Sequence, residues 1–147
     1  KDPLLTPVIE YVFDTTISAG KLLMSDILRL YPKVNFVFAY FGGAICYLKQ
    51  RFDATYSMLR SLNFVKDLQA APSEYFKNIY VDTSGDTTKA NFLLSLELMG
   101  AKHILWGSDW PAKQDVAAGI KAVNDLDISG EDKQNILGGN LAKMFAL

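Results

Sequence analysis

Cysteine is nearly absent from this 147-residue sequence, and long apolar runs are absent altogether. The one cysteine, Cys46, cannot form an internal disulfide, so we expect a reducing, cytoplasmic setting. No run of apolar residues reaches the roughly 20 that a membrane-spanning helix requires. The first residues also lack the charged segment and apolar stretch of a secretion signal. We therefore expect no membrane association.

Clusters of basic residues are missing as well. Fifteen Lys and Arg residues and sixteen Asp and Glu residues give a net charge of −1, and the basic residues are scattered along the chain. A nucleic-acid-binding surface normally has a basic patch, so we expect no nucleic-acid partner. The hydrophobic fraction of 50% and the charged fraction of 21% are typical of a globular protein. A chain of this length predicts one domain, residues 1–147.

Apolar runs rich in β-branched and aromatic residues alternate with segments of helical periodicity. The runs predict strands at 34–39, 78–82 and 103–106. Helices are predicted at 8–30 (with a break at Gly20), 47–68, 72–76, from Thr87 or Thr88 to 99, 114–124, from Ser129, and 140–145. The first strand is almost continuously apolar, which predicts burial on both faces. Alternation of this kind predicts an α/β fold with a parallel sheet.

Gly107-Ser108-Asp109-Trp110-Pro111 follows the third predicted strand. A carboxylate at the carboxyl end of a buried strand points into the mouth of the sheet, where folds of this class place their chemistry. Asp109 can bind a metal ion and orient or deprotonate its bound water. The alternative is an Asx-turn or helix-capping aspartate that closes the loop between strand and helix. Spacing alone slightly favours this structural interpretation.

Four motifs in this chain occur together and in order. They are Tyr31–Gly43, Asn78–Gly85, Ala101–Pro111 and Ile136–Ala142. Together they resemble the amidohydrolase-2 family, which includes the aminocarboxymuconate-semialdehyde and resorcylate decarboxylases. The resemblance implies the C-terminal part of a (β/α)8 barrel, a fold that takes about 250 residues when complete. It also implies metal-assisted hydrolysis or decarboxylation of a small carboxylic acid, with Asp109 as a metal ligand, usually to zinc.

Two further residues fall at positions that matter in the family. Tyr40 stands where the family has the histidine that acts as acid and base. A tyrosine, with an ordinary pKa of about 10, donates a hydrogen bond but does not readily exchange a proton near pH 7; a structural tyrosine at the strand end is the simpler explanation. Arg51 matches an arginine that, in the decarboxylases, grips a substrate carboxylate in the neighbouring subunit's site. That role implies a homo-oligomer; the alternative is a surface arginine paired with a nearby aspartate.

The remaining polar residues near the predicted strands have weaker signals. Asp82, Ser84 and Asp86 follow the second strand, and we expect them to line the mouth of the sheet. His103 is the only histidine, and its position before the third strand places it at the end away from the active site. We expect it to be a surface or strand-edge residue rather than a metal ligand.

The family's other metal ligands are a His-x-His pair on the first strand and a histidine on a middle strand, and this sequence has neither. A catalytic zinc site usually needs three protein ligands, so we expect this chain alone not to hold the metal and to be inactive. Three explanations are open. The chain, which begins at Lys1 rather than Met, is a fragment of a longer enzyme, a degenerate relative that acts as an interaction protein, or one of two chains that assemble.

A partial barrel exposes unpaired backbone groups at its terminal strands and apolar side chains on its inner face. We therefore predict that the isolated chain self-associates or aggregates unless another polypeptide covers those surfaces. Light scattering measures the state of association directly. A monodisperse monomer with a cooperative thermal melt would contradict this prediction.

Overall fold

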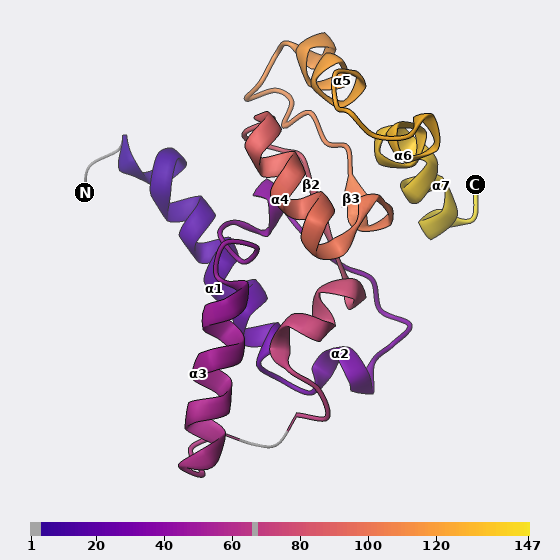
Figure 1. Cartoon of the computed structure of the whole chain (residues 1–147). Coiled ribbons are helices and arrows are strands. Elements are labelled where there is room, and N and C mark those ends of the chain that lie inside the picture. The colour runs from indigo at the N-terminus through magenta and orange to yellow at the C-terminus, as the bar shows by residue number, and fades with distance from the viewer. Residues whose placement is uncertain (1–3, 66–67) are drawn as a thin grey trace.

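A parallel three-stranded sheet forms the centre of the chain in the computed structural model, which describes residues 4–65 and 68–147 (Figure 1). The strands are β1 (Phe36–Phe38), β2 (Ile79–Asp82) and β3 (Ile104–Leu105), in the order β1-β2-β3. Both neighbouring pairs run parallel. The predicted α/β class and parallel sheet are confirmed.

Helices precede, connect and follow the strands. The α-helices are α1 (Tyr11–Leu23), α2 (Ile27–Leu30), α3 (Lys49–Ser61), α4 (Lys89–Met99), α5 (Val116–Asn124), α6 (Gly130–Gln134) and α7 (Asn140–Phe145). Shorter turns of 3-10 helix are η2 (Tyr40–Gly42), η3 (Pro72–Asn78) and η4 (Ala101–His103), and turns of π-helix are η1 (Thr6–Glu10) and η5 (Asn135–Gly139). In Figure 1, α4 crosses beside β2 and β3, and α5 to α7 lie on the β3 side of the molecule.

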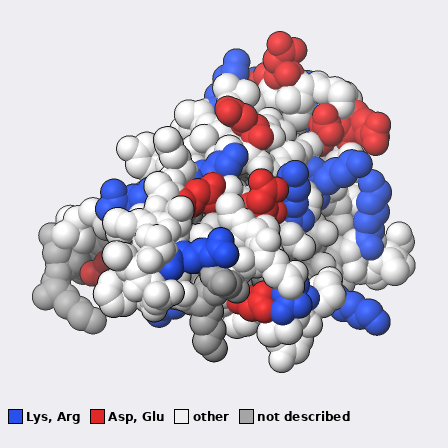
Figure 2. Space-filling model, turned by 60° about the horizontal axis from the view of Figure 1, so that its bottom comes forward, with Lys and Arg blue, Asp and Glu red and all other residues white. Residues whose placement is uncertain are grey.

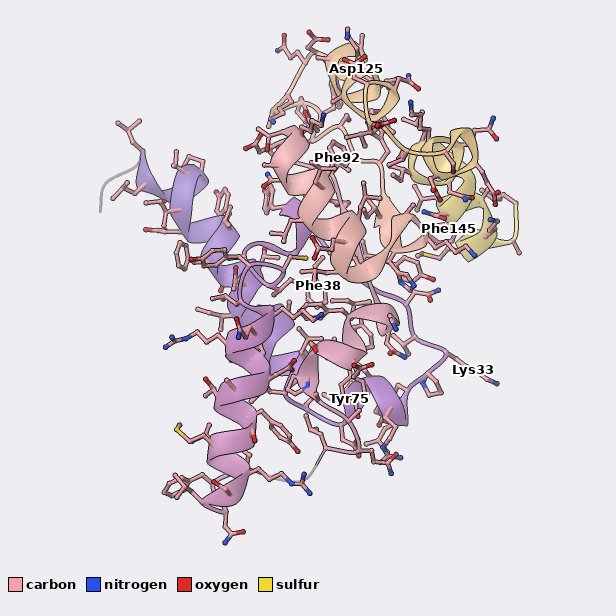
Figure 3. All side chains as sticks on the ribbon, in the orientation of Figure 1. Lys33, Phe38, Tyr75, Phe92, Asp125 and Phe145 are labelled. Carbon is pink, nitrogen blue, oxygen red and sulfur yellow. The ribbon has the colours of Figure 1, made fainter. Side chains whose placement is uncertain are left out.

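The hydrophobic core lies between the sheet and its covering helices. Ile79, Val81 and Ile104 are fully buried and contribute the sheet side of this core. Phe92 of α4 packs edge-on against Phe41, with the ring centroids 5.1 Å apart and the planes at 87°. Figure 3 shows Phe92 on α4, with Phe38 below it near the centre of the molecule. Tight interdigitation of this kind fixes the direction of each strand, and hence the place where each strand ends.

β1 differs from its prediction in length and burial. It has three residues instead of the expected 34–39, and Val37 at its centre is 45% exposed. The prediction of burial on both faces was wrong, because none of the described residues buries the face that carries Val37, whereas Phe36 and Phe38 pack against the core. β1 also has only one neighbouring strand among the described residues, β2, so its backbone edge is open as well. Apolar composition alone does not distinguish this case from a central strand.

β3 has its outer edge covered by the C-terminal segment. The Trp106 amide donates to the carbonyl oxygen of Ile136 at 3.0 Å. The Asn140 side chain, 5% exposed, donates from Nδ2 to the carbonyl oxygens of Ala101 and Ile104, both at 2.8 Å. These bonds satisfy backbone groups that would otherwise be buried without partners. The motif Ile136–Ala142 therefore has a structural role beside β3.

Several predicted helix boundaries shift. Gly20 lies inside α1, where it packs close to the Phe52 ring, and the first helix is interrupted after Leu23 instead. The helix predicted at 47–68 ends at Ser61, followed by Asn63 with a positive φ of 59°; residues 66–67 of that prediction lie outside the described residues. Among residues 4–65 and 68–147, no helix combines the length and apolar character needed to cross a membrane.

Charges of both signs share the surface. In Figure 2, Lys and Arg side chains alternate with Asp and Glu side chains over the visible face. Two of the ion pairs are local, between Arg29 and Asp26 in α2 and between Lys121 and Asp125 at the end of α5. Exposed pairs of this kind contribute little to stability. The fold therefore depends on its core and on buried hydrogen bonds.

We predict that Asn140→Ala lowers the free energy of unfolding by about 1–3 kcal/mol, because two buried carbonyl groups lose their donor. Urea unfolding followed by circular dichroism measures this loss. Asn124→Ala, at an exposed position at the end of α5, is the matched control and is expected to change the free energy by less than about 0.5 kcal/mol. An equal effect of the two substitutions would contradict the role assigned to Asn140.

Candidate active site at the carboxyl ends of the strands

Hydrogen bonds made by three consecutive residues, Asp82, Thr83 and Ser84, join the ends of the three strands. The carboxylate of Asp82 accepts at Oδ1 from the Tyr40 amide at 3.3 Å and from the Ser84 amide at 3.0 Å, and the Tyr40 amide also lies 3.2 Å from Ser84 Oγ. Thr83 Oγ1 accepts from the Gly107 amide at 3.0 Å and donates to the Gly107 carbonyl at 3.2 Å. Asp82 and Ser84 thus anchor the backbone that follows β1, and Thr83 anchors the backbone that follows β3.

Tyr40 and Asp109 both have left-handed backbone conformations, with φ values of 57° and 61°. Such values are uncommon for residues other than glycine, and they persist only where the surroundings enforce them. At Tyr40 the enforcing contacts are those of its amide with Asp82 and Ser84. Strained residues of this kind concentrate at functional sites, which supports the choice of both residues from the sequence.

A cavity of about 540 Å³ lies at this end of the sheet. Tyr40 and Asp109 both line it, so the structure brings together two of the three residues selected from the sequence. Asp86 lines it as well, as expected, but Asp82 and Ser84 are not among the lining residues. Arg51, the third selected residue, is exposed on α3 and is not among the lining residues. Within one chain, Arg51 does not reach the cavity.

Tyr40 stays protonated near neutral pH. Burial raises the pKa of its phenol above the ordinary value of 10.0, and the nearby carboxylates of Asp109 and Asp82 raise it further. The ring lies against Gly85, where a Cβ atom would come within 2.6 Å of Tyr40 Cδ1. Gly85 also has a φ of 84°, so both the contact with the Tyr40 ring and the backbone conformation disfavour a side chain at this position. Tyr40 is therefore a fixed hydrogen-bond donor at the cavity wall.

The described residues do not form a zinc site by themselves. No group of three or more His, Cys, Asp or Glu side chains is close enough to hold a metal ion within residues 4–65 and 68–147. Asp82, the other carboxylate at the strand ends, uses Oδ1 to accept hydrogen bonds from Tyr40 and Ser84. A three-ligand site built around Asp109 thus needs ligands from outside these residues.

Sequence patterns missed three contributors to the cavity. Tyr11 comes from the start of α1, Asn91 from α4, and Lys113 from the loop after Pro111. The Lys113 amide donates to the Asp109 carbonyl at 3.0 Å, which closes a turn and keeps Lys113 beside Asp109. Asp109 and Pro111 are residues typical of turns and could have indicated the turn that brings Lys113 back, but the directions of α1 and α4 depend on tertiary packing.

His103 lies at the opposite end of the sheet, as the sequence predicted. It belongs to η4, before β3, and its Nδ1 is 3.0 Å from the carbonyl oxygen of Ile79. Its ring packs on Tyr80 with a centroid distance of 5.1 Å. His103 is partly buried and held by these contacts, and it does not line the cavity of Tyr40 and Asp109.

The sequence profile of the amidohydrolase family, type 2, matches residues 14–147 of this chain. The chain belongs to the amidohydrolase-2 family. Gamma-resorcylate decarboxylase from Polaromonas sp. (strain JS666) is 23% identical over 144 residues, which are 98% of this chain and 44% of that enzyme. The chain thus spans less than half the length of the curated relatives it matches.

Solved structures share this fold. The 5-carboxyvanillate decarboxylase of Sphingomonas paucimobilis matches 92% of this chain with a TM-score of 0.84 at 26% identity, and the match covers 41% of that enzyme. A dihydroxybenzoic acid decarboxylase from Polaromonas sp. JS666, solved with manganese and 2-nitroresorcinol, matches 90% with a TM-score of 0.73 at 23% identity, over 40% of its length. The structural neighbours are TIM-barrel decarboxylases, so this α/β chain corresponds to part of such a barrel.

Because of Tyr40, the free energy of unfolding should decrease as pH rises in the alkaline range. Because its folded-state pKa is raised, the folded chain retains a proton that the unfolded chain loses near pH 10. The resulting stabilisation is complete below pH 10 and disappears as pH rises through the folded-state pKa. We predict that the free energy of unfolding decreases less between pH 8 and pH 11 in Tyr40→Phe than in the parent chain. Urea unfolding at each pH measures this difference.

Cys46 is also buried, and burial raises the pKa of its thiol. Its contribution is common to the parent chain and to Tyr40→Phe, so it cancels in the comparison. Tyr47→Phe, at a position 81% exposed, is the matched control and should follow the parent chain. Identical pH dependence in all three proteins would show that Tyr40 is not protected in the folded state.

Proposed function

We propose that this chain supplies the carboxyl-terminal part of the active site of a metal-dependent hydrolase or decarboxylase that acts on a small carboxylic acid. The observation that carries the proposal is the meeting of Tyr40 and Asp109 at one cavity, at the strand ends of an amidohydrolase-2 fold. Strand carboxyl ends are where barrels of this kind place their chemistry. Two relatives are decarboxylases of aromatic acids, gamma-resorcylate and 5-carboxyvanillate, which favours decarboxylation over hydrolysis.

Each selected residue has a distinct role in this proposal. Asp109 contributes one carboxylate to a divalent metal, which would polarise the substrate or its attacking water when bound. Tyr40 donates a hydrogen bond to the substrate from its protonated phenol and does not exchange the proton. Arg51 projects from α3 into solvent, a position that suits a carboxylate clamp in the site of a neighbouring subunit. The protein is then a homo-oligomer.

The metal we expect is zinc, although three of the structural relatives contain manganese. Asp109 is one ligand of at least three, so the 147-residue chain is inactive by itself in this proposal. The other ligands come from a further segment of polypeptide that completes the barrel, in the same chain or in a second one. The location that we propose remains the reducing cytoplasm, in accord with the single, buried Cys46.

A non-catalytic interaction protein is the alternative, and exposed apolar residues favour it. One stripe on η1 and α1 is formed by Leu5, Ile9, Phe13 and Ile17, which are 42–59% exposed. These residues recur at every fourth position, so they share one side of the helix. The buried residues of α1, which include Ala19 and Leu23, lie on the neighbouring side of the helix. A helix that is apolar on two sides is typical of a segment that packs against a second layer.

Metal content and turnover separate these two functions. We predict that the 147-residue chain, dialysed after incubation with zinc or manganese, retains less than stoichiometric metal and releases no carbon dioxide from gamma-resorcylate. If the coding sequence before Lys1 encodes a His-x-His strand, the longer chain should bind metal stoichiometrically and lose it in Asp109→Ala. Asp127→Ala, a surface change near the end of α5, is the matched control.

Two results would contradict the proposal. Stoichiometric metal on the 147-residue chain that disappears in Asp109→Ala would show that the chain is complete enough to be active. A longer chain with the His-x-His strand that binds no metal and has no turnover would favour the interaction protein.

A further inference from the structure

A carboxylic acid that enters the cavity of Tyr40 and Asp109 meets a negative environment. Asp86 and Asp109 both line the cavity, and both repel an anionic group. Arg51, the cation selected from the sequence, lies outside the cavity on α3. A site for a carboxylate therefore needs a positive charge from another residue of this chain, from the metal, or from a neighbouring subunit.

Lys113 is the one cationic side chain among the described residues that line this cavity. It also lines a second cavity of about 270 Å³, between the β3 exit loop and the start of α5, so it stands at the boundary between the two. Its amide is bonded to the Asp109 carbonyl at 3.0 Å, which fixes the base of the side chain. Within residues 4–65 and 68–147, Lys113 makes no ion pair. Its ammonium is available to an incoming anion.

The rest of the cavity lining contains both apolar and polar residues. Pro7, Val8 and Val12 of η1 and α1 are apolar, and Tyr11 and Tyr40 add aromatic rings. Asn91 and Lys113 add polar groups to the two aspartates. A volume of about 540 Å³ is in the usual range for a small-molecule site. A ligand with a planar ring and one carboxylate matches this mixed lining.

We propose that Lys113 determines specificity for anionic ligands by pairing with the ligand carboxylate in this cavity. The inference rests on the proposed function and deepens it, because it adds a cation of the same chain to the carboxylate contact that the proposed function gives to Arg51 of a neighbouring subunit. Lysine acts here as a point charge with a flexible stem, so it accepts carboxylates at several orientations. Because Lys113 is exposed, the pairing is sensitive to salt.

The test compares two probes that differ by one carboxylate, gamma-resorcylate and resorcinol. Affinities are measured on the 147-residue chain by ligand-observed NMR titration, with EDTA present so that no metal supplies the positive charge. We expect the parent chain to prefer gamma-resorcylate over resorcinol, and Lys113→Met to reduce that preference by about 3- to 5-fold. Lys113→Arg should keep the preference, and 0.5 M salt should weaken it in the parent chain.

One matched variant removes a positive charge elsewhere. Lys102→Met lies at the opposite end of the sheet beside His103, and it should keep the preference of the parent chain if the effect is local to the cavity. Arg51→Met removes the cation on α3 that the proposed function gives to a neighbouring subunit's site, so it tests a competing source of positive charge and is not a control. Circular dichroism melts confirm that each variant is folded, which is expected because Lys102, Lys113 and Arg51 are all exposed.

Three outcomes would overturn the inference. They are equal binding of the two probes by the parent chain, an unchanged preference in Lys113→Met, and loss of the preference in Arg51→Met with Lys113→Met unaffected. The proposed function is judged separately, by metal content and turnover of the longer chain. A longer chain without turnover leaves the binding comparison valid, and a failed binding comparison leaves the turnover experiment valid.

Discussion

The hydrogen bonds at the ends of the strands are the constraint on which the candidate site depends. Asp82 accepts from the Tyr40 amide, and Thr83 exchanges two hydrogen bonds with Gly107. These contacts fix the directions in which the backbone leaves β1 and β3 relative to β2, which lies between them. Without them, Tyr40 and Asp109, which are 69 positions apart in the sequence, would have no reason to face one cavity. The same bonds enforce the unusual backbone of Tyr40.

The packing of β2 in the buried core contributes to the same arrangement. Ile79 and Val81 alternate with Tyr80 and Asp82 along β2, so one face of the strand is fully buried and the other is half-buried. Because side chains alternate between faces, the burial of Ile79 and Val81 decides the side on which Asp82 emerges. Packing and polar contacts therefore specify the same orientation of Asp82, as expected for a sequence in which local preferences and the global fold agree.

Much of this could be predicted from the sequence. The order of helices and strands, the parallel sheet, the end of α4 at Met99 and the positions of Tyr40 and Asp109 at strand ends all follow from local patterns. The exposure of Val37 could not be predicted, because it depends on which face of β1 other residues cover. Lys113 and Tyr11 were missed because they reach the cavity from a loop and from the first helix, and their directions are set by contacts distant in sequence. The role of Asn140 was hidden for the same reason, since its carbonyl partners are 36 and 39 positions away.

The cover on the outer edge of β3 bears on the way the chain is made. Ribosomes synthesise proteins from the N-terminus, so Ile136 and Asn140, the residues that cover this edge, emerge after β3. Until then the β3 edge is open, and Ile104 and Leu105 are available to pair with other extended chains. The residues that pair β2 with β3 have all been synthesised by residue 105. The nascent chain is therefore most vulnerable to misassembly between the synthesis of β3 and that of Asn140, whose side chain then covers the edge.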